Sequence, residues 1–240
     1  MGRKVAKLLA AHPRLMLSAA LERKPGPIAE CGDALITDDP IKALAGAQVV
    51  IDFAAPPATT SLGPLCAERG VAYLVASTGL GAPEQAAIDA AAARVPVLQA
   101  ANLSLGVNVL LELVESATRR LRGFEVEILE LHHRHKRDAP SGTALALGKA
   151  VERGRGPVKT VMGRAGVGEP RAADELGYAA VRGGEVAGEH TVFLFGDDER
   201  LELTHRATSP DIFAHGAVTA AAWLAGKPAG RYTMADVLKG

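Results

Sequence analysis

The 240-residue sequence has few aromatic side chains, few cysteines and no net charge. Its two cysteines, Cys31 and Cys66, lie far apart, which excludes a disulfide scaffold and a C-x-x-C zinc framework. Lys and Arg number 27 and are balanced by 27 Asp and Glu. A large polyanion-binding surface is therefore not indicated, and we expect no nucleic-acid partner.

Long apolar runs are also missing. No stretch approaches the ~20 apolar residues that span a bilayer. The apolar stretch after Met1-Gly2-Arg3-Lys4 is too short for a signal peptide. We therefore expect no membrane association and a cytoplasmic location. The 48% of hydrophobic residues are ample for the packed core of one or two domains.

Up to about residue 100, predicted helices alternate with short, apolar strands. The helices are expected at 2–12, 41–47, 59–68 and 83–93, and the strands at 15–21, 49–53, 71–76 and 95–98. Apolar strands joined by crossover helices predict a doubly wound parallel sheet, an α/β fold of the Rossmann type. Ligands of such sheets bind beyond the carboxyl ends of the strands.

After residue 104 the pattern changes to strands with little helix between them. Helices are expected at 105–121 and 141–152, strands at 124–131, 178–181, 189–195 and 200–205, and a loop at 153–168. This predicts a second, α+β domain with an open mixed sheet. A last helix, 213–224, has an Ala-rich face suited to packing on the first domain. The predicted domains are 1–104 with 214–240, and 105–213.

The strongest local signal is the segment Glu130–Ala144, which reads ELHHRHKRDAPSGTA. Three histidines, a lysine and two arginines stand within six residues at the end of a predicted strand. A helix start built from Pro-Ser-Gly-Thr follows at once. The unpaired N–H groups and the dipole of a helix start attract anions, and small residues let an anion approach closely. The segment therefore predicts a pocket for a small di-acid, lined by proton donors.

Three other interpretations of this basic run stay open. It could be a solvated surface loop. His133 and His135 fall on the same side of an extended chain and could form a metal pair, but no Cys, Asp or Glu stands at useful spacing within the cluster. Nucleic-acid binding is the weakest interpretation, because stacking aromatic residues are absent. We expect no metal.

Two further signals lie at predicted strand ends in the first domain. Glu22 and Arg23 follow a strand, and Gly2 stands twenty positions earlier. An acidic residue about 20 positions after a glycine turn commonly binds the adenosine ribose, although no G-x-G-x-x-G is present. Small and hydroxyl residues, suited to a ribose or nicotinamide or simply to ordinary turns, end two more strands: Ala76, Ser77, Thr78, Ala100, Ala101, Asn102 and Leu103.

Together these segments resemble the dihydrodipicolinate reductases. Residues 130–144 match the family pattern E-x-H-H-x-x-K-x-D-A-P-S-G-T-A almost residue for residue, and 101–108 match A-N-F-S-x-G-V-N with Leu103 in place of the aromatic residue. Weaker matches are DFAAP at 52–56, ASTG at 76–79, GEHT at 188–191 and ERLELTH at 199–205. The resemblance covers nearly the whole chain.

The resemblance implies a function and the residues that perform it. It implies NADPH- or NADH-dependent reduction of (2S,4S)-4-hydroxy-2,3,4,5-tetrahydrodipicolinate to 2,3,4,5-tetrahydrodipicolinate, in lysine and diaminopimelate biosynthesis, by a homotetramer assembled through the second domain. His132 would be the acid/base residue and Lys136 the proton donor. The substrate carboxylates would be held by Lys136 with His133, Ser141, Gly142 and Thr143. The nucleotide would be held by Glu22, Arg23, Ala76, Ser77, Thr78, Ala100, Ala101, Asn102 and Leu103.

The sequence also departs from the family pattern. Family members begin with a strand and G-x-x-G-R-M-G, of which only the end is matched here, so we expect a sheet that lacks a central strand. Ala76 replaces a glycine, and Pro210 stands where an arginine is expected. Two alternatives follow: a truncated, non-catalytic homologue that binds di-acids, or a related nicotinamide-dependent reductase of another small dicarboxylate.

Overall fold

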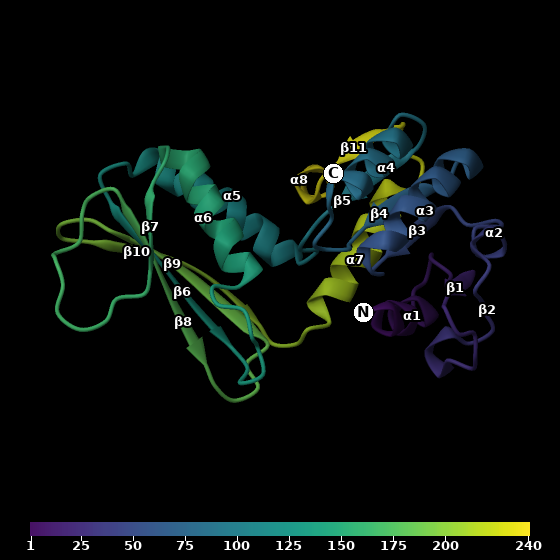
Figure 1. Ribbon diagram of the computed structural model, residues 1–240, viewed down its shortest axis with the longest axis horizontal. Coiled ribbons are helices and arrows are strands. Elements are labelled where there is room, and N and C mark those ends of the chain that lie inside the picture. Colours follow the sequence, from purple (N-terminus) through teal and green to yellow (C-terminus); the bar gives the residue numbers. More distant parts are fainter. The chain divides into compact units, whose positions relative to one another are not determined.

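The computed structural model describes residues 1–240, and they form two compact units (Figure 1). Unit 1 comprises Met1–Leu105 and Asp211–Gly240, and unit 2 comprises Gly106–Pro210. None of the helices combines the length and the apolar character that crossing a membrane requires.

Unit 1 contains a four-stranded sheet in which every strand is parallel to its neighbours. Its order is β11-β5-β4-β3, formed by β3 (Val49–Asp52), β4 (Ala72–Val75), β5 (Pro96–Gln99) and β11 (Gly230–Tyr232). The central strand β4 is buried along its whole length, as expected for a strand covered on both faces. The prediction of a doubly wound parallel sheet is confirmed.

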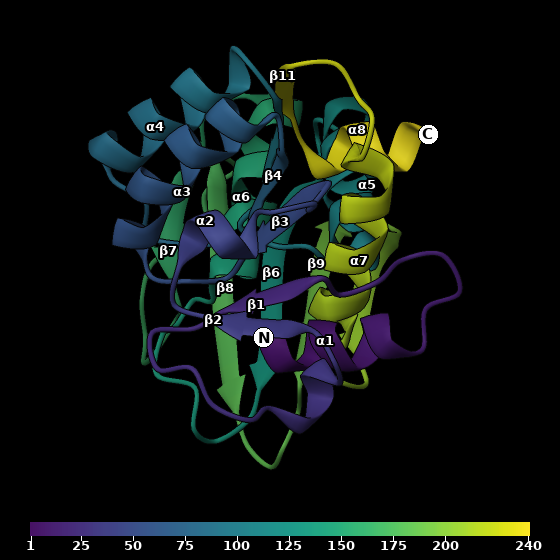
Figure 2. The same cartoon turned by 90° about the vertical axis from the view of Figure 1, so that its right-hand side faces the viewer.

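Helices cover both faces of this sheet (Figures 1 and 2). On one face, Tyr73 and Val75 pack with α3 (Pro56–Arg69) and α4 (Ala82–Ala92). On the other, Leu74 and the neighbouring strands pack with α1 (Gly2–Ala10), α7 (Ile212–Leu224) and α8 (Met234–Lys239). Because successive side chains of a strand point to opposite faces, one short apolar strand serves both layers.

The N-terminal part of unit 1 forms a separate parallel pair of strands, β1 (Ala19–Leu21) and β2 (Leu35–Thr37), with the short helices η1 (Ala29–Cys31) and α2 (Pro40–Ala43) nearby. The predicted strand at 15–21 is thus reduced to its last three residues, and Met16 is 84% exposed. Strand β3 is an edge of its sheet and has no hydrogen-bonded neighbour beyond it.

Unit 2 contains a five-stranded mixed sheet of order β10-β9-β6-β8-β7. Its elements are α5 (Leu105–Arg120), β6 (Glu125–His132), α6 (Gly142–Arg155), β7 (Lys159–Met162), β8 (Glu175–Arg182), β9 (Gly188–Phe195) and β10 (Arg200–Ala207). Strand β6 runs parallel to β8 and antiparallel to β9, so the predicted mixed sheet is confirmed. Helices α5 and α6 share a core with the inward residues of β6, β8 and β9.

The predicted loop at 153–168 is wrong in part. Helix α6 continues to Arg155, and Lys159–Met162 form the edge strand β7 beside β8. Three of the four β7 residues are exposed, so no apolar pattern in the sequence marks this strand. It is defined by its backbone pairing with β8. The short elements β2, β11 and α8 were likewise not predicted.

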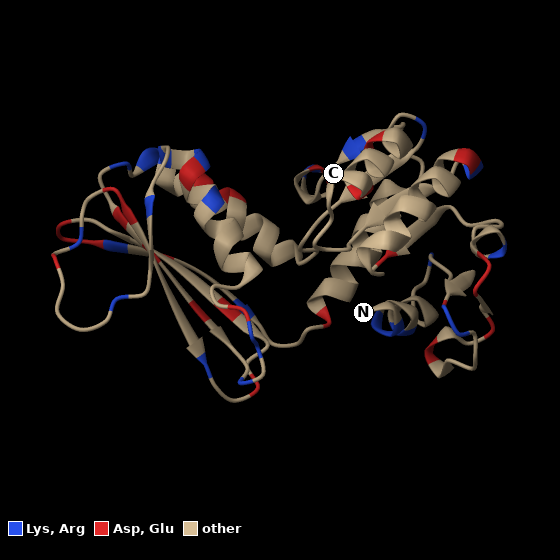
Figure 3. Ribbon diagram, viewed as in Figure 1, with Lys and Arg blue, Asp and Glu red and all other residues tan.

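Helix α7 is the central packing element of unit 1. It carries no charged residue, and its ribbon is uncharged along its length in Figure 3. Seven of its residues are buried. At Gly216 the helix passes so close to the chain that a Cβ atom would lie 1.8 Å from the backbone carbonyl oxygen of Leu103. Backbone atoms cannot rotate away, so this contact requires glycine.

We therefore predict that Gly216→Ala lowers the free energy of unfolding by about 1–3 kcal/mol, the usual cost of overpacking a core. Urea unfolding followed by circular dichroism measures this. The control is Gly2→Ala in α1, where a Cβ meets nothing within 4 Å and the better helix propensity of Ala stabilises if anything. An unchanged midpoint for Gly216→Ala would contradict the close approach.

Candidate active site

The site in unit 2 begins where β6 ends and α6 starts. His132 is the last residue of β6, and Ser141 is the N-cap of α6. The Ser141 hydroxyl oxygen accepts a hydrogen bond from the Ala144 amide at 3.2 Å, which is why Ser favours this position. Gly142 and Thr143 form the first turn, at the positive end of the helix dipole. The structure thus places three predicted carboxylate-binding residues together at one helix start.

A buried carboxylate connects the strand end to the helix start. Glu130 is 1% exposed and lies on β6 on the same side as His132, because the two are two residues apart in a strand. Its Oε1 accepts hydrogen bonds from the Ser141 amide (3.1 Å) and from Nη2 of Arg182 (2.6 Å). Burial alone would raise the pKa of Glu130, but these donors outweigh it and the pKa is lowered. Glu130 is therefore ionised at neutral pH.

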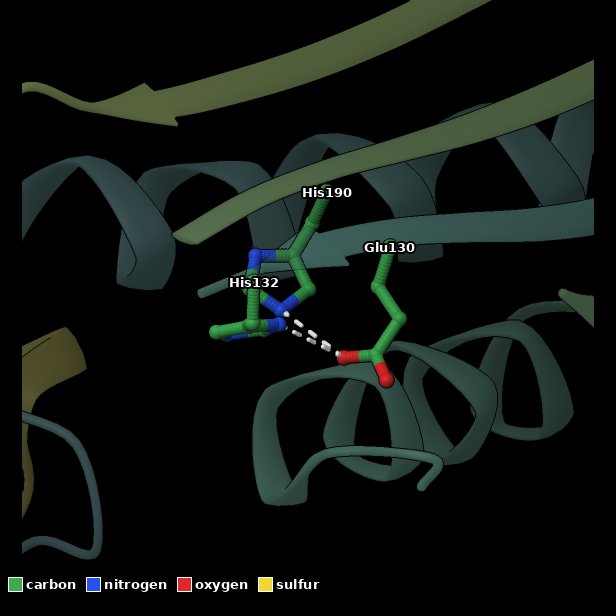
Figure 4. A group of neighbouring side chains, drawn as sticks. All are labelled: Glu130, His132 and His190. Atoms are coloured by element: carbon green, nitrogen blue, oxygen red, sulfur yellow. Dashed lines mark ion pairs between the residues drawn. The ribbon is translucent and has the colours of Figure 1, made fainter. Parts of the chain in front are cut away.

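The other carboxylate oxygen faces two imidazoles (Figure 4). Glu130 Oε2 lies 3.2 Å from Nδ1 of His132 and 3.7 Å from Nε2 of His190. The rings of His132 and His190 meet edge to face, with centroids 5.0 Å apart. Burial lowers the pKa of both histidines, that of His190 to about 4. Both imidazoles are therefore neutral at neutral pH and able to accept or pass a proton.

The cluster of Glu130, His132 and His190 also has the spacing of a metal site, with one ligand atom from each within 4.8 Å of the others. The sequence argument concerned a metal pair of His133 and His135, whereas the strand brings Glu130 beside His132 and His190. However, Oε1 of Glu130 is already bound by the Arg182 guanidinium and the Ser141 amide. A divalent cation would be repelled by that guanidinium, so we interpret the cluster as a polar network anchored by the ion pair of Glu130 with Arg182.

Glycine is required beside His132. A Cβ atom on Gly188 would lie 3.0 Å from Nε2 of His132, and Gly188 has φ +149°. Both the space and the backbone conformation favour glycine there. The start of β9 therefore passes directly alongside the ring nitrogen of His132 that faces away from Glu130.

In the rest of the basic segment, some side chains make contacts with neighbouring residues and others are solvated. Nζ of Lys136 lies 2.9 Å from both carboxylate oxygens of Asp138. Nδ1 of His133 accepts a hydrogen bond from the His135 amide, and the His133 side chain is half-buried. Arg134, His135 and Arg137 are exposed, so the solvated-loop interpretation holds for these three residues.

In unit 1, the ends of β4 and β5 meet at a small cavity. Its volume is about 220 Å³, and its lining includes four of the predicted residues, Ala76, Ala100, Ala101 and Leu103. Three other predicted residues lie at the same strand ends. Ser77 is buried and donates to the Ala54 carbonyl, Asn102 accepts from the Ser104 amide, and Thr78 is exposed.

Glu22 and Arg23 are exposed and directly follow β1. The Glu22 amide donates to the Thr37 carbonyl, which continues the pairing of β1 with β2. Neither residue lines the cavity at the ends of β4 and β5. The structure therefore brings the predicted nucleotide residues together in two separate groups.

Sequence reasoning missed three members of the network in unit 2. Glu130 could have been found, because a residue two positions before His132 shares its side of the strand. Arg182 and His190 come from β8 and β9, and they meet Glu130 only through the strand register, which pairs Glu130 with His190 and His132 with Arg182.

Comparisons with known proteins agree over both units. Residues 1–103 match the family model "Dihydrodipicolinate reductase, N-terminus", and residues 106–238 match "Dihydrodipicolinate reductase, C-terminus". The 4-hydroxy-tetrahydrodipicolinate reductases of Anaeromyxobacter sp. (strain Fw109-5) and Thiobacillus denitrificans are 49% and 45% identical, over 99% of this chain and 93% and 94% of theirs.

A solved structure shows the same fold. The dihydrodipicolinate reductase of Paenisporosarcina sp. TG-14, determined with dipicolinate bound, superposes with a TM-score of 0.82 at 18% identity, covering 97% of this chain and 92% of that one. With two family models spanning nearly all of the sequence and relatives well above 40% identity, the chain belongs to the dihydrodipicolinate reductase family.

Proposed function

We propose that this protein reduces (2S,4S)-4-hydroxy-2,3,4,5-tetrahydrodipicolinate to 2,3,4,5-tetrahydrodipicolinate, a step of lysine and diaminopimelate biosynthesis, with NADPH or NADH. The overall reaction takes up a hydride and a proton and releases water. Relatives at 45–49% identity bear the name of this activity. The observation that carries the proposal is the neutral, buried His132 beside the start of α6, since it joins a proton-transfer group to an anion-attracting helix end.

In this proposal unit 1 is the nucleotide-binding domain. The strand-end cavity in unit 1 suits a planar ring, because Ala76, Ala100 and Ala101 leave room close to the backbone. Ser77, Thr78, Asn102 and Leu103 lie beside these residues and complete the proposed nicotinamide-side contacts, whereas Glu22 and Arg23 would meet the adenosine ribose or its phosphate. The reduced nicotinamide supplies the hydride when it is bound.

Unit 2 would bind the substrate. The two carboxylates of the substrate would be attracted by Lys136, His133 and the start of α6 at Ser141, Gly142 and Thr143. His132 would act as the acid/base residue, and Lys136 would donate the proton that quenches the charge left by hydride addition. Both groups lie at the same end of β6, so a single di-acid can reach them.

We predict that His132→Gln and Lys136→Ala each lower turnover by about 100-fold or more, the usual contribution of a general acid or base. Steady-state rates with NADPH and the hydroxylated substrate measure this. Arg134→Ala is the matched control, since this exposed cation of the same segment should leave the rate near that of the wild type. If both variants keep wild-type rates, the proposed roles are wrong.

We also predict that Glu22→Ala weakens NADH binding more than NADPH binding, because a carboxylate recognises the free ribose diol and repels a 2′-phosphate. Calorimetric titration with each nucleotide measures the two affinities. Glu68→Ala, which removes an exposed carboxylate of α3 in the same unit, should change neither. Equal losses for both nucleotides on Glu22→Ala would argue against ribose recognition.

We further propose a cytoplasmic homotetramer assembled through unit 2. The face of its sheet opposite α5 and α6 carries the half-buried side chains of Leu129, Leu131, Phe193 and Phe195, and the two Phe rings stack at 5.7 Å. Apolar side chains on an uncovered sheet face favour burial against another chain.

Phe193→Asp is therefore expected to shift the protein from tetramers to smaller species in sedimentation velocity, because Phe193 pairs in register with Glu127 and Glu202 and a third carboxylate adds repulsion. Leu113→Asp, on the exposed side of α5, should leave the distribution unchanged. A monomeric wild type at micromolar concentration would refute this assembly.

A further inference from the structure

Two buried residues of unit 2 have no part in the proposed chemistry as described so far. Glu130 is 1% exposed and His190 is 4% exposed, and both lie behind groups assigned to the substrate, His132 and Ser141. Burying a charge or an imidazole costs free energy unless hydrogen bonds or ion pairs compensate for it. Figure 4 shows that Glu130 and His190 stand directly beside His132.

The first consequence concerns the proton on His132. Glu130 is ionised, so its Oε2 is an acceptor only. Oε2 lies 3.2 Å from Nδ1 of His132, in a contact that is not an aligned hydrogen bond. The negative oxygen favours the tautomer with the hydrogen on Nδ1, as a buried carboxylate does for a catalytic imidazole. Nε2 of His132 is then the nitrogen left to exchange a proton with a substrate.

The second consequence concerns the hydroxyl of Ser141. Nδ1 of His190 is buried without a hydrogen-bond partner, so a hydrogen there would be an orphaned donor. The hydrogen of neutral His190 therefore belongs on Nε2, which lies 3.0 Å from the Ser141 hydroxyl oxygen. That oxygen also accepts from the Ala144 amide. With both lone pairs engaged, the Ser141 hydroxyl hydrogen is available only for donation to another acceptor.

We propose that Glu130 and His190 are positioning residues: Glu130 directs the proton of His132 to Nδ1, and His190 turns Ser141 into a hydrogen-bond donor for a substrate carboxylate. The proposal rests on the function proposed above for His132 and Ser141. It assigns the two residues separable effects, one on proton transfer and one on binding of the di-acid.

The same network defines how a change at Glu130 alters the pH dependence. The charged and titratable groups around the pair of His132 and His190 are Glu130 on β6, Lys136 and Asp138 after it, Arg182 on β8 and His205 on β10. Glu130 raises the pKa of His132 against burial and the nearby cations. Removing its charge therefore lowers the pKa of His132, so the limb of the pH–rate profile that reports His132 moves to lower pH.

The test compares isosteric and apolar variants of the two residues. Glu130→Gln should lower kcat by about 10-fold or more and move that limb to lower pH, with little change in KM. His190→Leu should raise KM and weaken the binding of pyridine-2,6-dicarboxylate by about 10-fold, the loss of one hydrogen bond to a charged group, with a smaller effect on kcat. His190→Gln keeps an N–H near the position of Nε2 and should restore most of that affinity.

Glu115→Gln is the matched control, because it removes a carboxylate of the same unit that forms ion pairs with Arg119 and Arg153. Circular dichroism and nucleotide titration establish that each variant is folded. The positioning roles are overturned if wild type is active but Glu130→Gln and His190→Leu behave like Glu115→Gln, or if His190→Gln fails to restore affinity. They are also overturned if chelation abolishes wild-type activity and Zn²⁺ restores it, because the cluster would then be a metal site. An inactive wild type, in contrast, contradicts the proposed function itself.

Discussion

The ion pair between Glu130 and Arg182 is the contact on which the site in unit 2 depends. A carboxylate that is 1% exposed stays charged only because Arg182 and the Ser141 amide donate to the same oxygen. Removing one partner of such a buried pair typically costs about 3–5 kcal/mol, since the other charge is left uncompensated. The pair also ties β6 to β8 and to the start of α6, so the same contact that stabilises the charge fixes the positions of His132 and Ser141.

The alternation of strand β6 explains how a core and a site share one element. Val126 and Ile128 are buried under the helices, and Glu130 and His132 continue the same side of the strand to its end. Polar residues can occupy the last two inward positions because α6 starts there and supplies donors instead of apolar side chains. The inward side of β6 thus carries core residues along most of its length and site residues at its end.

Unit 1 is organised by a different constraint, which is close backbone approach. The uncharged helix α7 passes against Leu103 at Gly216, and the strand ends Ala76 and Ala100 leave a cavity that larger side chains would fill. The apolar strands predicted at 49–53, 71–76 and 95–98 were found in place, because a buried parallel strand needs a continuous apolar run. The edge strand β7 escaped prediction, since its exposed residues follow no pattern and its pairing with β8 alone defines it.

By itself, the sequence determined the fold class of both units, the family and the segment 130–144 in which the site begins. It could do so because hydrophobic periodicity, capping residues and a specific motif are local properties of the chain. Only the tertiary structure decided that Glu130, Arg182 and His190 form one network with His132. Their meeting depends on the register of β6 with β8 and β9, and register is set by long-range packing that no local pattern encodes.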